Sequence, residues 1–383
     1  MAARALIVSL SLGGGHGKAG EVVAAAVREL APGWETRCVD LRDHMAPWLR
    51  AAYVGGYLWA IRRMPWLYGF LYRHPPRRRG GTLPRGALRL GLRGYEQLVR
   101  DYEPRVIVCT QLTASEATDR LRALGVYQGP TATVVTDFDA HPAWRADHID
   151  VFFVPDEALR ERFVGLGIAP GRVEATGVPI DPAFERDFPV AELKARHGVR
   201  PGVPVVLLMG GSLGLGSLEA AVRRLLAPGR PLDLLVVAGH NRRLQARLER
   251  LAGAAQASGR QSRLRVFGFV DFVAELMAIA DLFVSKPGGL SMTEAATMGL
   301  ATLAIAPLAG QEQANAAHLE AQGVVRWLRR GESLAAAVDG LLADEPARQR
   351  LAAAAAAYAR RHSARRIASR LLQLAGEGGG DLC

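Results

Sequence analysis

Three stretches of the chain share one design: an apolar run, then glycines, then a helical pattern. They lie at residues 4–30, 204–226 and 281–298. A strand, a glycine turn and a helix N-terminus together favour anion binding, because unpaired N–H groups and the positive end of the helix dipole face the ligand. Phosphate is the expected ligand. A single Gly-Gly turn is equally typical of a plain turn, so the prediction depends on the repetition.

The third of these stretches contains the sharpest local signal. Its predicted helix covers residues 291–298, with Ser291 at a cap-like position and Glu294 three residues later. This spacing is that of a capping box, in which the two side chains bond to the backbone of the first turn. A carboxylate used in that way cannot also reach a ligand.

Strand-like apolar runs alternate with helical patterns along most of the 383 residues. This alternation predicts the α/β class, with two doubly wound Rossmann-like domains facing a central cleft. The predicted domains are residues 1–184 and 200–355. Residues 356–383 are predicted as a C-terminal helix, able to pack back on the first domain, and a disordered tail.

The glycine loop predicted at residues 13–17 contains His16, and a helix is predicted to follow over residues 18–30. A helix N-terminus disfavours imidazolium, so the ring would be a neutral base near pH 7. The equal alternative is a capping or hydrogen-bonding histidine. Dinucleotide-binding folds carry an acidic residue at the end of the second strand. Asp40 has a suitable position for this, so a dinucleotide site stays open as a further alternative.

Polar residues follow two other predicted strands, where α/β active sites form. Asp137 and His141 come after the strand over 131–136 and compete for catalytic or acceptor-binding roles; the alternative is an Asp-capped turn. Gln311, Glu312 and Asn315 come after the strand over 301–306. Their side chains suit vicinal sugar hydroxyls, and the alternative is a polar helix start.

The net charge is +11, and its distribution is uneven. Between His44 and Tyr95 there are ten arginines and no acidic residue, and residues 47–72 hold three of the six tryptophans and half of the eight tyrosines. Aromatic rings beside arginines are typical of a segment at a membrane surface. An ordinary pair of core helices is the alternative. The positive charge alone leaves nucleic acid as an alternative partner, but it is not expected, since no recognised binding motif is present.

Several other features limit the classes of protein to which the chain can belong. No apolar run is long enough for a transmembrane helix, and the short run at residues 5–12 reads as a strand rather than a signal peptide. The three cysteines have no metal-binding spacing, which favours a reducing compartment.

Four motifs resemble those of the glycosyltransferases that build glycolipids on diacylglycerol, namely monogalactosyldiacylglycerol synthase and the bacterial processive diacylglycerol glucosyltransferases of glycosyltransferase family 28. They are SLGGGHGKA at 11–19, TDFDAHPAW at 136–144, TGVPI at 176–180 and SKPGGLSMTEA at 285–295. The resemblance covers about residues 5–330. It implies the two-domain GT-B fold, which the lipid II N-acetylglucosaminyltransferase shares.

The resemblance implies a set of donor-binding residues in the second half. The two glycine loops would hold the diphosphate of a UDP-sugar, Phe269 and Val270 would meet the uracil, and Glu294 would take the ribose hydroxyls. The residues assigned to the donor are Gly211, Ser212, Leu213, Gly214, His240, Asn241, Phe269, Val270, Lys286, Gly288, Gly289, Leu290, Ser291, Glu294, Gln311, Glu312 and Asn315. Relatives commonly have Arg where this chain has residues 239–241, so a diphosphate contact there would be weaker or come from Arg242 or Arg243.

The first half would bind diacylglycerol and anionic lipids, which implies a peripheral protein on the cytoplasmic face of the membrane. The residues assigned to the acceptor and membrane are Gly14, Gly15, Tyr53, Tyr57, Trp59, Trp66, Tyr68 and Tyr72. The implied reaction is one direct, inverting displacement with His16 as base and with Asp137 and His141 as rivals. No cofactor or metal is expected.

Other readings of the whole chain stay open. They are transfer of N-acetylglucosamine to a polyprenyl-diphosphate lipid, a nucleotide-sugar epimerase, and a lipid-binding module without enzyme activity. The sequence leaves glucose and galactose undecided as the donor sugar.

Overall fold

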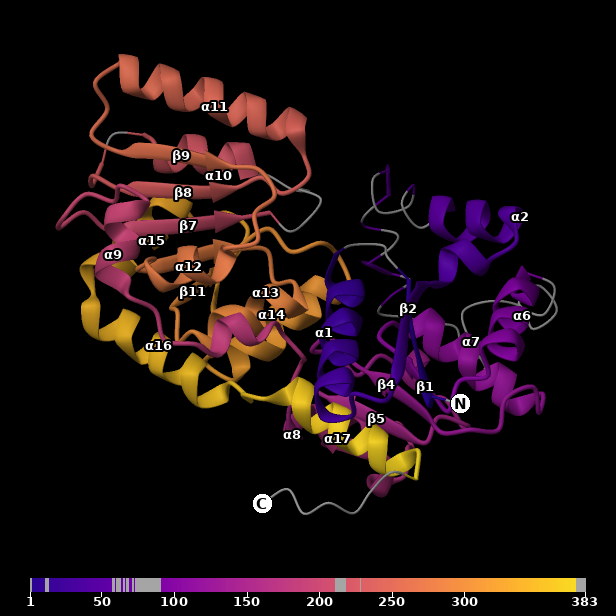
Figure 1. Ribbon diagram of the computed structural model, residues 1–383. Coiled ribbons are helices and arrows are strands. Elements are labelled where there is room, and N and C mark those ends of the chain that lie inside the picture. The colour runs from indigo at the N-terminus through magenta and orange to yellow at the C-terminus, as the bar shows by residue number, and fades with distance from the viewer. Residues whose placement is uncertain are drawn as a thin grey trace. The chain divides into compact units, whose positions relative to one another are not determined.

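The computed structural model describes residues 2–10, 14–56, 91–210, 218–227 and 229–376, with single residues between 59 and 72 (Figure 1). The chain divides into two compact units. One comprises Met1–Ile180, Ala309–Gln311 and Arg360–Cys383, and the other comprises Asp181–Leu308 and Glu312–Ala359.

The first unit is built on a parallel six-stranded sheet of order β2-β1-β3-β4-β5-β6. Its strands are β1 (Arg4–Ser9), β2 (Glu35–Asp40), β3 (Val106–Cys109), β4 (Thr131–Val134), β5 (Val151–Val154) and β6 (Val173–Ala175). Ile7 on β1 pairs with Cys38 on β2 and with Val108 on β3. Since all six strands are parallel, their carboxyl ends meet at one edge.

Helices cover both faces of this sheet. They are α1 (Gly14–Leu30), α2 (Pro47–Arg50), α6 (Arg93–Tyr102), α7 (Leu112–Ala123), α8 (Glu157–Gly165) and α17 (Ser363–Leu374), with short turns η1 (Leu41–His44), η2 (Ala51–Gly55), η3 (Pro142–Trp144) and η4 (Pro170–Arg172). Val23 of α1 and Ile367 of α17 pack on the face that carries Ile7. Tyr95 of α6 packs on the opposite face, with Leu6.

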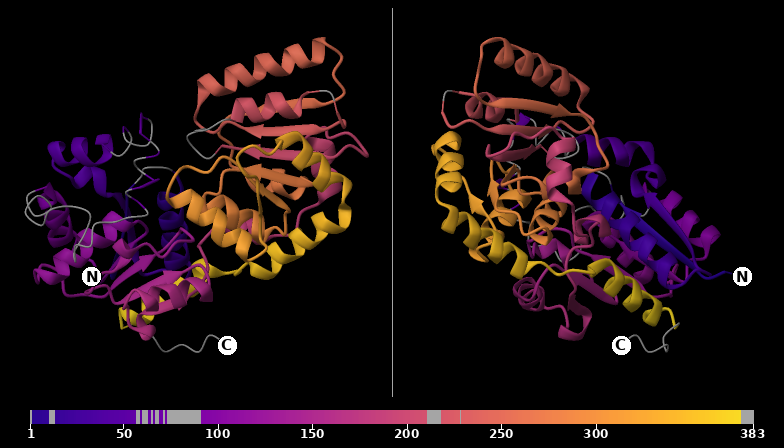
Figure 2. Two further views of the ribbon diagram at one scale, coloured as in Figure 1. Left: turned by 180° about the vertical axis from the view of Figure 1, so that it is seen from behind. Right: turned by 60° about the vertical axis from the view of Figure 1, so that its left-hand side comes forward.

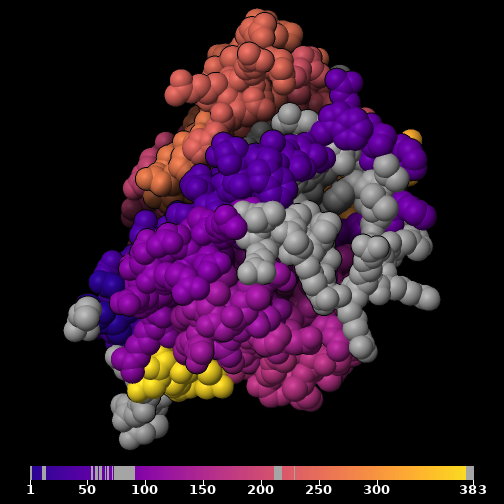
Figure 3. All heavy atoms as spheres, turned by 90° about the vertical axis from the view of Figure 1, so that its right-hand side faces the viewer, coloured from indigo at the N-terminus to yellow at the C-terminus, as the bar shows by residue number. Residues whose placement is uncertain are grey.

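The last helix, α17, lies beside α1 although more than 300 residues separate them (Figure 1). The space-filling view shows this yellow end of the chain against the surface of the first unit (Figure 3). Helix α17 is hydrogen-bonded to the segment TGVPI at residues 176–180. Ser363 Oγ donates to the Val178 carbonyl (2.8 Å), and Arg366 donates to the Thr176 carbonyl (2.7 Å). Gly177 has φ +91°, and a Cβ there would lie 2.7 Å from Arg360 Cβ. This motif therefore holds the N-terminal end of α17.

The second unit also has a parallel six-stranded sheet, of order β12-β11-β10-β7-β8-β9. Its strands are β7 (Val205–Met209), β8 (Asp233–Val237), β9 (Arg263–Phe267), β10 (Leu282–Ser285), β11 (Thr302–Ala304) and β12 (Arg326–Trp327). Val206, Val236 and Val284 point to one face, where they pack with Val222 and Leu244. The alternate residues Leu207, Leu235 and Phe283 are equally buried and point to the other face.

The helices of this part of the chain are η5 (Pro182–Glu185), α9 (Val190–Arg196), α10 (Leu218–Leu225), α11 (Arg242–Ala257), α12 (Val273–Ala278), α13 (Gly289–Thr297), α14 (Gln311–Ala321), α15 (Leu334–Ala343) and α16 (Glu345–Tyr358). The long helix α16 packs against α13 and α15 on the outside of the unit (Figure 2). The predicted pair of doubly wound parallel sheets is thus confirmed.

Two helix starts differ from the prediction. Helix α1 begins at Gly14 rather than Lys18, and α13 begins at Gly289 rather than Ser291. In both cases the glycines that were expected to form a loop lie in the first turn. The first N–H groups of a helix have no acceptor within the helix, so the N–H groups of these glycines still point out of the helix end.

Candidate active site

His16 lies in the first turn of α1, at the carboxyl edge of the first sheet. Its Nδ1 is 2.8 Å from the hydroxyl of Thr136, which follows β4. Its backbone carbonyl accepts a hydrogen bond from the hydroxyl of Thr110, which follows β3 (2.8 Å). The ring is half-buried, and both threonines are buried. One ring nitrogen is therefore held, and Nε2 is the nitrogen left for chemistry.

His141, the rival base, has both ring nitrogens engaged. Its Nδ1 accepts from the backbone N–H of Ala143 (3.2 Å), so the ring proton must be on Nε2, which lies 3.0 Å from the Tyr72 carbonyl. The Tyr72 ring is tilted against it, with centroids 4.5 Å apart. This bonding argues for a structural role and against His141 as the base.

Asp139 completes a cluster around Tyr72. Its carboxylate accepts from the Tyr72 hydroxyl (2.8 Å) and from Arg162 (2.7 Å). Together, Asp139, His141 and Arg162 fix Tyr72 to the end of β4. Asp137 is buried beside this cluster, with 8% of its surface exposed, and it has contacts of its own.

Asp40, which left a dinucleotide site open, ends β2 and pairs with Arg42. Its carboxylate accepts from the backbone N–H of Arg42 (3.0 Å) and from its guanidinium (2.6 Å). These bonds raise the pKa of Arg42, chiefly through the side-chain hydrogen bond. The carboxylate therefore caps the local turn η1.

In the second unit, the predicted anion site is the turn between β10 and α13. Gly288 is the N-cap of α13, and no side chain of the described residues caps this helix. The predicted capping box of Ser291 and Glu294 is therefore wrong, because the N-cap lies three residues before Ser291. Glu294 is half-buried in the second turn of α13 and has contacts of its own.

Among the described residues, a Cβ on Gly288 would meet no atom within 4 Å, so the packing of this part of the chain does not require glycine there. A close approach by a ligand would require it.

Lys286 and Glu312 form an ion pair beside the same turn (2.5 Å), with 22% and 12% of their side chains exposed. Glu312 also accepts from the Leu308 backbone N–H (2.8 Å), and Asn315 donates to the Pro287 carbonyl (3.1 Å). Ala306, before α14, has φ +42°, which is uncommon for a residue with a side chain. These contacts join β10, β11 and α14 into one polar cluster.

His240 and Phe269 stack at the carboxyl ends of β8 and β9, with ring centroids 4.2 Å apart and planes 12° apart. Phe269 is 64% exposed. Asn241 caps α11 by accepting from the Leu244 N–H (3.0 Å), so its side chain stabilises the helix start. The remaining assigned residues Val270, Leu290, Ser291 and Gln311 are on or beside β9, α13 and α14.

Some predicted site residues lie outside the described part of the chain. They are Gly211, Ser212, Leu213 and Gly214 of the second glycine loop, Tyr57 and Tyr68, and the side chain of Tyr53. Gly14 and Gly15 are described and begin α1.

Three described aromatic residues of the membrane segment are exposed, whereas Tyr72 is half-buried against His141. Trp59 is 56% exposed, Trp66 70% and Phe70 51%, and Trp48 is 50% exposed nearby. Single exposed apolar side chains are common, whereas contiguous exposed apolar patches mark contacts with proteins or membranes.

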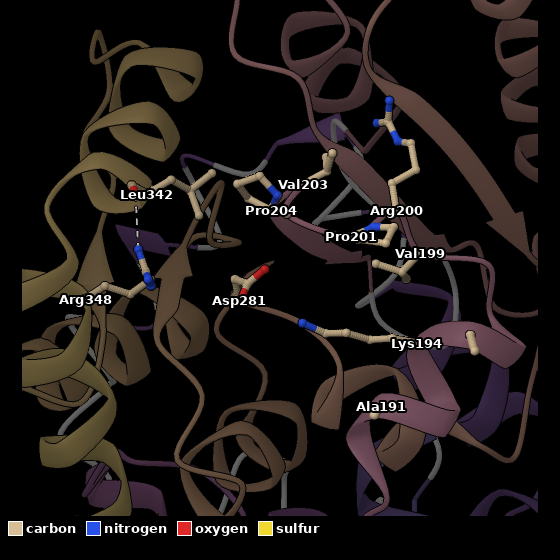
Figure 4. Close-up of a pocket in the computed structure, with 12 residues that line it drawn as sticks. Ala191, Lys194, Val199, Arg200, Pro201, Val203, Pro204, Asp281, Leu342 and Arg348 are labelled. Atoms are coloured by element: carbon tan, nitrogen blue, oxygen red, sulfur yellow. Dashed lines mark hydrogen bonds between the residues drawn. The ribbon is translucent and has the colours of Figure 1, made fainter.

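A cavity of about 520 Å³ lies in the second unit, at the opposite edge of the sheet from the anion site. Pro204 and Asp281, which precede β7 and β10, line it together with Lys194 and Arg348 (Figure 4). It is thus separate from the carboxyl ends that carry the candidate site.

Thr110, Thr136 and Arg162 were not assigned roles from the sequence. The signal for the two threonines is a hydroxyl one or two residues after a strand, which is common. Across the described residues, none of the helices is long and apolar enough to cross a bilayer. The described residues also contain no group of three or more metal-ligating side chains.

Family models match both halves of the chain. The monogalactosyldiacylglycerol (MGDG) synthase model matches residues 16–180, and the glycosyl transferases group 1 model matches residues 217–358. The processive diacylglycerol beta-glucosyltransferase of Bacillus subtilis is 30% identical over 263 residues, which cover 69% of this chain and 67% of that protein. The chloroplastic monogalactosyldiacylglycerol synthase of Spinacia oleracea is 28% identical over 358 residues, covering 88% and 65%. The chain thus spans about two thirds of these relatives.

Solved structures show the same fold at low identity. MurG of Acinetobacter baumannii superposes with a TM-score of 0.62 at 15% identity, covering 97% of this chain and 99% of that one. The S. aureus MnaA–UDP structure also gives 0.62, at 14% identity, with 98% of each chain covered. The fold is therefore GT-B, as the motifs implied.

Proposed function

The chain belongs to the family of diacylglycerol glucosyltransferases and monogalactosyldiacylglycerol synthases, and we propose that it transfers a hexose from UDP-glucose or UDP-galactose to diacylglycerol. It is a glycosyltransferase of glycolipid synthesis. The names of its relatives support the acceptor, and the UDP-glucose complex of a structure with the same fold supports a UDP-sugar donor. We place the reaction at the cytoplasmic surface of the membrane, with the protein bound peripherally.

The observation that carries the chemistry is the position of His16 at the start of α1, with Nδ1 held by Thr136. In the proposed reaction, a hydroxyl oxygen of diacylglycerol attacks the anomeric carbon as the bond from that carbon to UDP breaks. The electron pair leaves on the β-phosphate oxygen, and Nε2 of His16 takes the hydroxyl proton. One such displacement inverts the anomeric centre.

The start of α13 suits the departing diphosphate. Its first turn, which no described side chain caps, presents N–H groups and the positive end of the dipole, and no described atom lies within 4 Å of a Cβ placed on Gly288. Lys286 adds a positive charge beside it. These groups stabilise negative charge on UDP, Glu294 would take the ribose hydroxyls, and Glu312 with Asn315 and Gln311 would face the sugar.

The exposed tryptophans and the arginine-rich segment favour binding to an anionic membrane surface. Rings such as Trp59 and Trp66 can enter the headgroup region, while arginines pair with lipid phosphates. This supports an acceptor lipid bound to the first unit, which carries His16.

The test is an assay of the purified protein with radiolabelled UDP-glucose, UDP-galactose or UDP-N-acetylglucosamine. Each donor is supplied with diacylglycerol vesicles, with a polyprenyl diphosphate lipid, or without lipid. We expect labelled glycosyldiacylglycerol from at least one hexose donor, with the same rate after dialysis against EDTA. Transfer only to the polyprenyl lipid, or epimerised nucleotide sugar without lipid, would replace the proposal with that activity.

A further inference from the structure

Two buried threonines hold His16 from the ends of neighbouring strands. Thr110 Oγ1 donates to the His16 carbonyl, and Thr136 Oγ1 contacts Nδ1, each at 2.8 Å. Thr110 is fully buried and Thr136 is 2% exposed. A Cβ on Gly20 would lie 2.9 Å from Ile7 Cγ2, so glycine at this position lets α1 lie close to the sheet. Thr110 fixes the backbone of His16, and Thr136 fixes its ring.

We propose that Thr136 is the positioning residue for His16, accepting a hydrogen bond from Nδ1–H so that the lone pair stays on Nε2. The inference rests on the proposed function, in which Nε2 is the base. The imidazole has two neutral tautomers, and only the one with hydrogen on Nδ1 can take a proton at Nε2. A hydroxyl that donated to Nδ1 would leave the hydrogen on Nε2 and the ring unable to act.

The same hydrogen bond persists through the reaction. When Nε2 takes the proton of the acceptor hydroxyl, Nδ1 still carries its own hydrogen and still donates it to Thr136. Because the partner is a neutral hydroxyl, it orients the ring without adding a negative charge beside it. The proton on Nε2 then passes to solvent after the sugar has been transferred, which restores the neutral ring.

Thr136→Val is the central variant, because it removes the hydroxyl and keeps the volume. Thr136→Ser restores the hydroxyl. Thr133→Val is the matched control: Thr133 lies on β4, is fully buried, and its hydroxyl pairs with Ser115 (2.7 Å) away from His16. It reports the cost of losing a buried hydroxyl on the strand that Thr136 follows.

The first measurement is the tautomer of His16, from nitrogen NMR of the full chain labelled at histidine, with the signal assigned by its loss in His16→Gln. We expect Nδ1–H in the wild type, in Thr136→Ser and in Thr133→Val, and a shift toward Nε2–H in Thr136→Val. A wild-type ring with hydrogen on Nε2, or a Thr136→Val ring unchanged from the wild type, overturns the inference.

The second measurement is turnover. We expect Thr136→Val to lower kcat about 10- to 100-fold while KM for the UDP-sugar stays within about twofold, and Thr136→Ser to recover most of the rate. Equal kcat in Thr136→Val and Thr133→Val would overturn the inference. The tautomer needs no acceptor lipid, so a failure of glycolipid synthesis with the expected tautomer would count against the proposed function alone.

Discussion

Lys286 Nζ lies 2.5 Å from a carboxylate oxygen of Glu312, so the cation beside the anion site is already paired in the free protein. The two side chains come from the end of β10 and the start of α14, 26 residues apart. A donor diphosphate would have to share or replace this partner. The pair therefore sets how much of the Lys286 charge is available to the nucleotide.

Glu312→Gln should tighten the binding of UDP and slow the transfer of sugar. Removing the carboxylate leaves the Lys286 charge to the diphosphate, which should increase UDP affinity about threefold or more. The sugar would lose a hydrogen-bonding partner, so kcat should fall. Calorimetry with UDP and steady-state kinetics measure the two effects.

The control for this change is Glu320→Gln on the same helix, whose carboxylate bonds to the Trp327 backbone instead. Its UDP affinity should stay within about twofold of the wild type. Combining Glu312→Gln with Lys286→Met should abolish the gain. Weaker UDP binding in Glu312→Gln would mean that Lys286 does not meet the diphosphate.

His16→Ala should lower kcat by about 100-fold or more, the usual contribution of a general base, and leave UDP binding nearly intact. His141→Asn tests His141 as the alternative base. It should change the stability of the protein more than the pH dependence of turnover, since both ring nitrogens of His141 bond to backbone groups. Unchanged turnover in His16→Ala would transfer the role to Asp137.

Gly177→Ala should destabilise the first unit by about 2 kcal/mol or more. Its φ of +91° is unfavourable for alanine, and the new Cβ would collide with Arg360 at the entry to α17. Gly171→Ala is the control, because a Cβ there meets nothing within 4 Å. The midpoints of urea unfolding measure both, and equal midpoints would contradict the docking role of this motif.

The stability of the first unit should fall in alkali through Cys109. Burial raises the pKa of this thiol to about 12, against a lowering by the hydrogen bond with Thr118. The unfolded thiol ionises near pH 8.5, so the stabilisation of the neutral form is complete below that pH and is lost as the pH rises toward 12. At pH 10 the loss is about 2 kcal/mol.

Cys109→Ser keeps a hydrogen-bonding partner for Thr118 and cannot ionise in this range. Unfolding by urea at pH 7.5 and pH 10 should show a smaller fall in stability for this variant than for the wild type. Parallel falls in the two proteins would assign the alkaline loss to other groups, such as Tyr95, whose pKa burial also raises.

Exchanging Trp59 and Trp66 for serine should weaken binding to anionic vesicles about tenfold or more. Losing about 60 Å² of inserted apolar surface costs about 1.5 kcal/mol. Leu124→Ala is the control, since Leu124 is also exposed, at 46%, but lies after α7. Sedimentation with vesicles measures the change. Binding that falls in high salt would assign part of the affinity to the arginines, whereas unchanged binding in the double variant would remove the tryptophans from the contact.

The sequence predicted the order of strands and helices well, because in a parallel sheet each buried strand is a compact apolar run and each connection is an amphipathic helix. It misjudged the starts of α1 and α13, where glycines that looked like loop residues lie in the first turn. A capping box needs the correct helix start, so the inference on Ser291 and Glu294 failed with it.

Side-chain partners distant in the sequence were beyond prediction. The engagement of His141 depends on Tyr72, 69 residues away, and the position of the His16 ring depends on Thr136, 120 residues away. The contact between His16 and Thr136 follows from the register of the sheet, which brings the ends of β1 and β4 to one edge, whereas Tyr72 comes from a segment outside the sheet. Local spacing carries no such information.

The most direct test is the structure of the lipid product. The wild type is incubated with an α-linked UDP-hexose and diacylglycerol vesicles, and the anomeric configuration of the glycolipid is read by proton NMR. We predict a β-linked glycosyldiacylglycerol that is nearly absent with His16→Ala. The proposed inverting transfer to diacylglycerol would be contradicted if neither hexose donor gave a glycosyldiacylglycerol, or if the product were α-linked.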